Sequence, residues 1–551
     1  MNGKDSCERP YLAKSFPKRF VWRKSLGLRT MVATGMTEPS ACAPVSNRPS
    51  SRSGLINCYK ITMSIEYIRK GVGMMAMSRA QRVKILIVLG MMSLLTALSG
   101  SSTNLAMPRI SEDLMISSSA ATWIVSIGLI TTAVLLVMFG HIGDLVSKNL
   151  VFLIGEVVFI VGSLLTGIAP TYLTIMAGRV VQAVGSAMIM ANSMGIISQY
   201  FPDANRAEAL AVISMFVSLG SISGPAFGGI LITWASWRWI YLFNVPVGIL
   251  IVLAGMRLLP LRRPAHGEIK RVWQQANWTG QNLFTGGMIL MFVSGYWLQQ
   301  PKQLWLGVGI LAGGILLTIL AFIQDQRSRS PWIAPSIMHN PDYLISVSVL
   351  LIVMLVNSVS NILLPFYLQS YGGISAFASG LLMMLQSVTM LMITPFAGWL
   401  ADHWNRYYLT ILGLFVLIVS QIGYASYPAK IAMTPIIWPI VANGAGMALF
   451  LSPNNALTMG AVDSSLSGVA GSMNSLARTV GLTIGISFGA TLLFAQLPGV
   501  TRISPQSGEP FLHALATVFW LATLVSVVGL VIVVFRSIRS YKSVTVRSKN
   551  K

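Results

Sequence analysis

From residue 83 onward, long apolar stretches alternate with short polar turns. A helix that crosses a bilayer needs roughly 20 consecutive apolar residues. Fourteen stretches reach this length, near residues 84–107, 120–139, 150–168, 173–197, 209–231, 239–259, 280–298, 304–324, 343–369, 378–400, 407–426, 431–457, 469–495 and 513–536. The pattern predicts an all-α integral membrane protein with fourteen spans, and the even number places both ends of the chain on one side of the bilayer.

The composition favours the same class. Of 551 residues, 54% are hydrophobic and only 10% are charged, a far lower charge content than soluble domains carry. The formal net charge of +23 is concentrated at the two ends of the chain and in short loops, as the positive-inside rule expects. The basic charge therefore indicates membrane topology, with the lipid bilayer as partner, and not a nucleic-acid surface.

The loops predict the orientation. Those expected to face the cytoplasm carry nine basic residues: Lys148, Arg206, Arg262, Arg263, Lys270, Arg271, Arg327, Arg329 and Arg406. Those expected to face outward carry five: Arg109, Arg238, Lys302, Lys430 and Arg502. Together with the basic ends, this bias predicts a multi-pass protein of the inner (cytoplasmic) membrane with both termini in the cytoplasm.

The leading segment, residues 1–82, is different in composition. It holds 15 Lys/Arg against 4 Asp/Glu and all three cysteines, so no disulfide or metal framework supports the membrane body. It lacks the apolar core of a signal peptide, and its composition predicts disorder. Two explanations stay open. Either translation begins later, at Met63, Met74, Met75 or Met77, or the segment is a basic cytoplasmic arm that rests on anionic lipid.

An internal repeat divides the chain. Two predicted cytoplasmic turns carry glycine, acid and base at a constant offset of 258 residues: Gly140, Asp144 and Lys148, then Gly398, Asp402 and Arg406. Parallel repeats are how many secondary transporters are built, with the substrate site between the halves. We therefore expect a basic extension (1–82), a six-helix bundle (83–260), a cytoplasmic linker with two inserted helices (261–342), a second six-helix bundle (343–536) and a basic cytoplasmic tail (537–551).

Each turn is a candidate conformational latch. Asp144 can cap backbone N–H groups or pair with a base across the interface between the halves, an interaction that would break when the bundles rock. Asp402 offers the same in the second half. The alternative, a solvated loop acid, is less favoured because the pattern recurs.

A glycine stripe marks the fifth predicted span. Gly220, Gly224 and Gly228 line one helix face, where a neighbouring backbone can approach closely. Pro225 lies inside the same run and predicts a kink or hinge, because it removes a backbone donor. Gly229 completes the run, which predicts a packed hinge; a simple dimerisation stripe is the alternative.

The chain resembles the major facilitator superfamily, and within it the fourteen-span drug:proton antiporters of the EmrB/QacA type. The fifth-span run matches every fixed position of the family's antiporter motif G-x-x-x-G-P-x-x-G-G. Three further stretches are similar to family motifs: the turn from Gly140 to Lys148, where Ser147 replaces a glycine, the run from Arg179 through Gln182 to Gly185, and the run from Trp237 to Gly248. The resemblance covers residues 84–536 and implies two six-helix bundles plus two inserted helices.

The sequence departs from this family at the end of the first span. Members read L-D-x-T-I-V-N-V-A-L-P there, whereas this chain has Ser99 at the acid's position and Asn104 further on. In the family that acid is placed to carry a proton or attract a cationic drug. Its absence leaves Arg179 without that partner. Ser99 and its neighbours can hydrogen-bond the guanidinium, which can also attract an anionic group.

Glu156 is the only carboxylate well inside a predicted span, and it is our candidate for proton coupling. It lies about 10 Å from the depth of Arg179, counted at 1.5 Å per residue, so no direct ion pair is expected. A Glu156 side chain that reaches back to the inner interface is the alternative.

Other polar residues predict a cavity. Asn357 and Asn361 lie one turn apart on one face, and Gln386 comes from the next span. Arg478 stands beside a second glycine stripe, Gly481, Gly485 and Gly489, in a span that resembles the family's R-x-x-G-x-x-x-G run. Interhelical hydrogen bonding is the plainer explanation for each of these polar side chains.

The function we expect is proton-coupled efflux of hydrophobic drugs or toxic compounds by alternating access. No enzyme motif or P-loop is present, so we expect neither catalysis nor ATP hydrolysis, and no cofactor or metal beyond the proton gradient. Export of an anionic metabolite is the alternative, while a receptor or scaffold would not need two related halves. We expect a small-molecule substrate, protons as the coupling ion, and a monomer.

Overall fold

The computed structural model describes residues 78–201, 203–261, 277–298, 303–328, 340–462, 467–497, 500 and 502–549. The predicted extension at residues 1–77 and most of the linker at 262–276 and 329–339 lie outside this part. Within the described residues all regular structure is helical.

The helices follow the predicted spans, and most extend beyond them at one or both ends. The first half contains α2 (Arg79–Asp113), α3 (Ser118–Leu145), α4 (Lys148–Gly167), α5 (Tyr172–Tyr200), α6 (Asp203–Trp234), and α7 (Trp239–Leu242) followed by α8 (Asn244–Leu258). The inserted pair is α10 (Trp278–Leu298) and α11 (Leu304–Arg327). The second half contains α13 (Pro341–Pro365) with the π-helical η2 (Phe366–Tyr371), α14 (Ala376–His403), α15 (Arg406–Ala425), α16 (Met433–Gly460), α17 (Ser467–Ala495) and α18 (Gly508–Lys549), the last preceded by the short η4 (Pro505–Ser507).

Thirteen helical segments in the described part are long and apolar enough to cross a membrane, with α7 and α8 forming one of them. The remaining long helix, α10, is less apolar because Gln281 and Asn282 lie near its start. It packs along α11, so the two inserted helices form an antiparallel pair. The prediction of an all-helical membrane fold is confirmed.

One expectation about the start of the chain needs correction. The first helix begins at Arg79, so residues 79–82 are not part of a disordered extension. Ser78 and Gln81 form a capping box, in which the Ser78 hydroxyl accepts from the Gln81 N–H at 3.1 Å and the Gln81 side chain accepts from the Ser78 N–H at 3.0 Å. At the other end α18 runs to Lys549, so the basic tail continues the last helix.

The two halves share one core at one end of the bundle and have separate cores at the other, and a further cluster joins α3 to α17 through the inserted pair. The shared core, at what we call the distal end, contains the last turns of α2 (Leu105–Ile110), α7, the end of α13 with η2, and the start of α18. At the opposite end, which we call the terminal end because α2 begins and α18 finishes there, one cluster joins α2, α4, α5, α6 and α8, and another joins α13, α15, α16 and α18.

Polar contacts also join the halves at the distal end. Gln369 of η2 donates to the Leu105 carbonyl of α2 at 3.0 Å. The backbone N–H of Ile503 donates to the Ser118 hydroxyl at 3.4 Å, next to a contact of 3.3 Å between Arg502 and the Met115 sulfur. The distal end is therefore closed by both apolar packing and hydrogen bonds.

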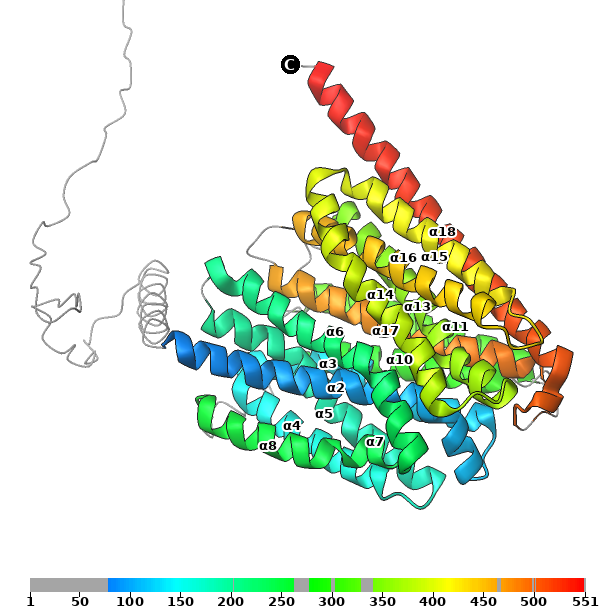
Figure 1. The fold of residues 1–551 in the computed structure, drawn as a ribbon. Helices are drawn as coiled ribbons and strands as arrows, with labels where there is room; N and C mark the ends of the chain where they lie inside the picture. Colours follow the sequence, from blue (N-terminus) through cyan, green and yellow to red (C-terminus); the bar gives the residue numbers. More distant parts are fainter. Residues whose placement is uncertain are drawn as a thin grey trace, which may run out of the picture. The chain divides into compact units, whose positions relative to one another are not determined.

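The glycine stripe of α6 contacts two helices. Figure 1 shows α6 beside α2 of its own half and α14 of the other half, and both pairs are in contact. A methyl group added at Gly220 or Gly224 would collide with α2, at the Leu94 carbonyl and the Ser101 hydroxyl. Gly229 lies against α14, where a methyl group would be 2.8 Å from the Ala376 carbonyl. The stripe is thus a close-packing surface within the chain.

Candidate functional site

A buried polar network joins four helices of the first half. The Asn244 amide of α8 donates to Ser99 of α2 at 3.0 Å and to Ser163 of α4 at 3.4 Å. The Gln182 amide of α5 donates to Ser163 at 2.8 Å and to Ser99 at 3.4 Å. All four side chains are at most 2% exposed. Ser99 and Ser163 are each shared by two amides, so the network fixes four helices at one depth.

Arg179 extends this network. Its guanidinium donates to the Gln182 side chain and to the Ile124 carbonyl of α3, the latter at 3.1 Å. It also lies 5.8 Å from the centre of the Tyr241 ring, a cation–π distance. The expected contact with the first span is indirect, because Gln182 lies between Arg179 and Ser99. Asn104 is not in the network, and its side-chain oxygen is buried without a hydrogen-bond partner among the described residues.

Glu156 lies outside this network. It is fully buried, and neither carboxylate oxygen has a hydrogen-bond partner in the described part of the chain. Its carboxylate faces Gly255 of α8, where an added methyl group would be 3.5 Å from Oε2 and 3.6 Å from Val88 of α2. The alternative of a Glu156 side chain that reaches the interface is therefore not what the structure has.

Glu156 and Ser163 share one face of α4, because seven residues make almost two full turns. Ile160 lies between them and packs on α8, where a methyl group at Gly248 would be 2.6 Å from its Cγ1. The carboxylate and the polar network thus lie along one seam between α4 and α8, separated by an apolar layer.

The two repeated turns have the same local structure. Ser147 caps α4 by accepting from the Leu150 N–H at 3.4 Å, and Asn405 caps α15 by accepting from the Tyr407 N–H at 3.0 Å. These two caps also differ by 258 in number. The side chains of Asp144 and Asp402 lie outside the described part, so their role as latch acids remains a prediction. Ser147 and Asn405 supply the capping bonds described here.

The two basic latch residues contact their own turn or a neighbouring helix. Arg406 donates to the Ala401 carbonyl of its own turn at 3.2 Å. A methyl group at Gly195 of α5 would collide with the Lys148 side chain, so Lys148 lies against α5. Gly140 and Gly398 have room for a side chain, since a methyl group would be 3.8 Å from Ala191 and 3.6 Å from Ser452.

The family model of the Major Facilitator Superfamily matches residues 89–490, and again residues 346–550. The chain belongs to this superfamily. Its members are transporters, which agrees with the two helical halves, the inserted pair and the closed distal end described above. The chain is accordingly a membrane transporter for a small molecule and not an enzyme.

Curated relatives in the superfamily carry different names. The chain is 26% identical to riboflavin transporter RibZ of Clostridioides difficile (strain 630), over 84% of this chain and 100% of the relative. It is 24% identical to multidrug resistance protein Stp of Mycobacterium tuberculosis (strain CDC 1551 / Oshkosh), over 80% and 82%. It is 25% identical to the probable multidrug resistance protein EmrY of Escherichia coli (strain K12), over 74% and 79%.

Two hydrogen bonds join the three residues predicted to line a cavity in the second half of this transporter. Gln386 of α14 donates to the Asn357 side chain of α13 at 2.7 Å, and the Asn361 amide donates to the Asn357 backbone carbonyl at 2.9 Å. The structure thus brings these three together. They are only partly buried, unlike the Ser99 network. Arg478 is on α17 and is exposed.

Two polar clusters of this transporter were missed by the sequence reasoning. At the distal end Asp113 accepts from the Trp237 indole at 3.0 Å and from Arg238 at 2.7 Å, which explains two residues of the motif that begins at Trp237. Asp325 is a second buried carboxylate, in the last turn of α11 just beyond the predicted span, and it accepts from Asn277 at 3.2 Å.

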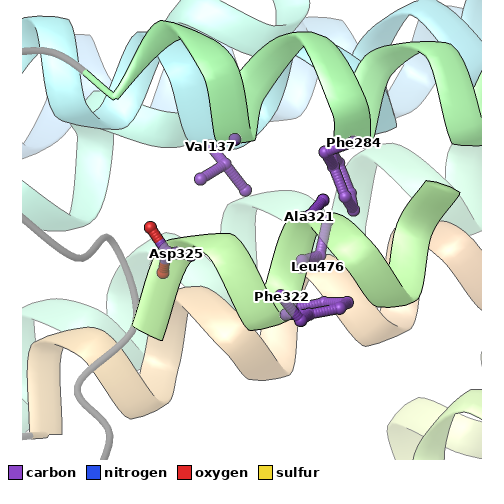
Figure 2. A pocket seen from close by; sticks show the side chains of 7 residues that line it. Val137, Phe284, Ala321, Phe322, Asp325 and Leu476 are labelled. Carbon is purple, nitrogen blue, oxygen red and sulfur yellow. The ribbon is translucent and has the colours of Figure 1, made fainter. Parts of the chain in front are cut away.

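Asp325 borders a small cavity of about 20 Å³ between the inserted pair and both halves. Figure 2 shows the Phe284 and Phe322 rings at one end and Asp325 at the other. The remaining lining comes from α3, α10, α11 and α17: Val137, Gly280, Ala321 and Leu476. Among the described residues no cluster of three or more His, Cys, Asp or Glu could hold a metal ion.

Proposed function

We propose that this chain is a proton-coupled exporter of hydrophobic drugs or toxic compounds that works by alternating access. The names of two relatives, Stp and EmrY, support multidrug export. The shared distal core and the separate terminal cores support a bundle that is closed at one end. In this proposal the protein lies in the inner membrane with its terminal end toward the cytoplasm. The functional unit is one chain.

The observation that supports the coupling is the burial of Glu156 without a hydrogen-bond partner among the described residues. An ionised carboxylate in an apolar site lacks the hydrogen bonds it has in water, so its charge is costly there and a bound proton removes that cost. A carboxyl group that loses and regains its proton as α4, α8 and α2 rearrange would couple the gradient to movement. In the proposed cycle this buried arrangement of Glu156 is the one that binds the proton.

The hinge of the proposed cycle is the stripe of α6. Gly220 and Gly224 hold α6 against α2 in the same half, while Pro225 and Gly229 lie against α14 in the other half. Rocking of the halves must separate the second contact and can leave the first intact. The same helix therefore serves as a fixed joint and a releasable gate.

The test uses the purified full chain in vesicles with an imposed pH gradient. Efflux of a cationic dye and of an anionic dye is compared for the unmodified protein, for Glu156→Gln, and for Glu112→Gln as a matched control. Glu112 is an exposed acid that pairs with Arg109 at 2.9 Å. We expect gradient-driven efflux that Glu156→Gln abolishes and Glu112→Gln retains. Efflux that survives Glu156→Gln would refute the coupling assignment, and no efflux of either dye would refute drug export.

A second candidate is export of an anionic metabolite. Two features favour it: Ser99 stands where the family places an acid, and Arg478 is an exposed cation within a span. The name of another relative, a riboflavin transporter, supports a metabolite as substrate. The charge of the preferred dye in the same experiment separates the two candidates.

A further inference from the structure

The membrane body contains two arginines that differ in how their charge is satisfied. Arg179 is buried and has the Ile124 carbonyl, Gln182 and the Tyr241 ring around its guanidinium. Arg478 lies about 16 Å along α17 from its start, counted at 1.5 Å per residue. It is exposed, and among the described residues it has no hydrogen bond or ion pair.

The exposed face of Arg478 points into the protein and not toward lipid. Leu476 and Val480, on the opposite face of α17, pack with α3 and α10. One turn before Arg478, the Asn474 amide donates to Asn455 of α16 at 3.2 Å. One turn after it, Leu482 packs against a cluster of residues from α13, α15, α16 and α18. Because residues four apart share a helix face, Arg478 lies on the side of α17 that Asn474 turns toward α16.

The acids described near the spans lie in another part of the structure or already have partners. Glu156 lies in the first half, between α4, α8 and α2. Asp325 bonds to Asn277, and Asp342 pairs with Arg536 at 3.3 Å. Arg478 is therefore a cation at membrane depth with an exposed side chain and no acid among these to neutralise it. Such a charge is costly to keep in a bilayer and marks a ligand path when it is kept.

We propose that Arg478 binds the anionic group of the transported compound, on the exposed face where α17 meets α16. The ligand class is an amphipathic organic anion with a carboxylate, sulfonate or phosphate group, for which guanidinium offers a planar pair of N–H donors. This assignment rests on the proposed function, since it names the substrate class of that exporter. An anionic lipid headgroup has the same chemistry, and the test separates the two sources.

The test uses two dyes with one skeleton, anilinonaphthalene sulfonate and uncharged phenylnaphthylamine. The full chain is purified in a neutral detergent for binding, and placed in phosphatidylcholine vesicles for efflux, so that no anionic lipid is present. Arg478→Gln removes the charge, Arg478→Lys keeps it without the planar donors, and Arg109→Gln removes an exposed charge near the end of α2 as control. A charge-assisted hydrogen bond is worth enough to change Kd about ten- to hundredfold.

We expect Arg478→Gln to raise Kd and KM for the sulfonate by about that factor and to leave both values for the uncharged dye unchanged. Arg478→Lys should lie between, and Arg109→Gln should match the unmodified protein. Equal effects on both dyes would overturn the assignment while leaving the exporter function intact. Binding in detergent tests the site even if no dye is exported. If Arg478→Gln alters only retention of added phosphatidylglycerol, the anion is a lipid headgroup and the substrate assignment is overturned.

Discussion

The Asn244 amide donates to the Ser99 hydroxyl at 3.0 Å, at the position where similar transporters carry an acid. The structure therefore keeps the hydrogen-bond donors that would surround such an acid, since Gln182 also donates to Ser99. A serine accepts both bonds without a charge. In the proposed cycle the proton-binding carboxylate is instead Glu156, which lies farther along the α4–α8 seam toward the terminal end.

We expect Ser99→Asp to restore gradient-driven efflux to the inactive Glu156→Gln variant. The new carboxylate would accept from two amides and lie near Arg179, so it has the partners that an ionised acid needs and can exchange a proton. Ser99→Asn in the same background is the control, because it has similar size and no charge. Efflux that returns with Asn as well as Asp would mean that the side-chain volume, and not the acid, restores function.

The α2–α6 contact leads to a prediction about packing. A methyl group at Gly224 would collide with the Ser101 hydroxyl and lie 2.9 Å from its Cβ. Gly224→Ala should therefore push α6 from α2, lower stability by about 1–3 kcal/mol and reduce efflux. Gly100→Ala is the control, because nothing lies within 4 Å of its added methyl group.

A second substitution tests the cause of this loss. Ser101→Gly removes the side chain that the new methyl group meets, so the double variant Gly224→Ala with Ser101→Gly should regain part of the thermal stability. Coupling of this kind is expected only between residues in contact. If the stability loss of the double variant equals the sum of the losses of the two single variants, the clash lies elsewhere.

The helices, the two halves and the α6 stripe could be predicted from the sequence, because span length and small-residue spacing are local properties of the chain. The partnership of Asn357 with Gln386 also follows from spacing along neighbouring spans. The location of Glu156 relative to α8 could not, because it depends on which face of α4 packs on which neighbour. The sequence also gave no sign that Ser163 joins Ser99, since a lone serine in a span resembles many others.

Helix caps and the exact ends of the helices could not be predicted from the sequence pattern either. Ser147 looks like a departure from the family glycine, yet its hydroxyl caps α4 and Asn405 does the same for α15. Asp325 was excluded from the eighth span by one residue, although α11 continues to Arg327. Such boundaries depend on hydrogen bonds at the helix end, which hydropathy does not record.

Arg536 joins three helices at the terminal end and should matter more than its acidic partner. It donates to Ser346, lies 3.3 Å from Asp342 and lies 5.3 Å from the centre of the Tyr407 ring. Asp342 is 61% exposed whereas Arg536 is 5% exposed. We expect Asp342→Asn to cost less than about 1 kcal/mol, and Arg536→Ala to cost about 1–3 kcal/mol because it removes buried bonds.

Thermal unfolding in detergent at low and high salt measures this difference. The small effect of Asp342→Asn should vanish at high salt, because exposed charges are screened, and the effect of Arg536→Ala should persist. A loss that is equal for both variants would mean that the ion pair, and not the contacts with Ser346 and Tyr407, holds α18 in place.

The α6–α14 contact leads to a prediction about the transport cycle. Trp234 of α6 stacks on Phe377 of α14, with 6.0 Å between ring centres, so the two residues join the halves at the distal end. From residue 83 onward the chain has no cysteine, and the three in the leading segment can be replaced by serine. The double variant Trp234→Cys with Phe377→Cys then carries the only two thiols. We expect a short bifunctional thiol reagent to link them and to stop efflux, because the distal end can no longer open.

Each single variant treated with the same reagent is the control, since modification without a link should leave the halves free to move. A reagent with a reducible bridge should restore efflux after reduction. If the linked protein exports dye at the rate of the single variants, the α6–α14 contact stays closed throughout the cycle, and opening must occur elsewhere along the interface between the halves.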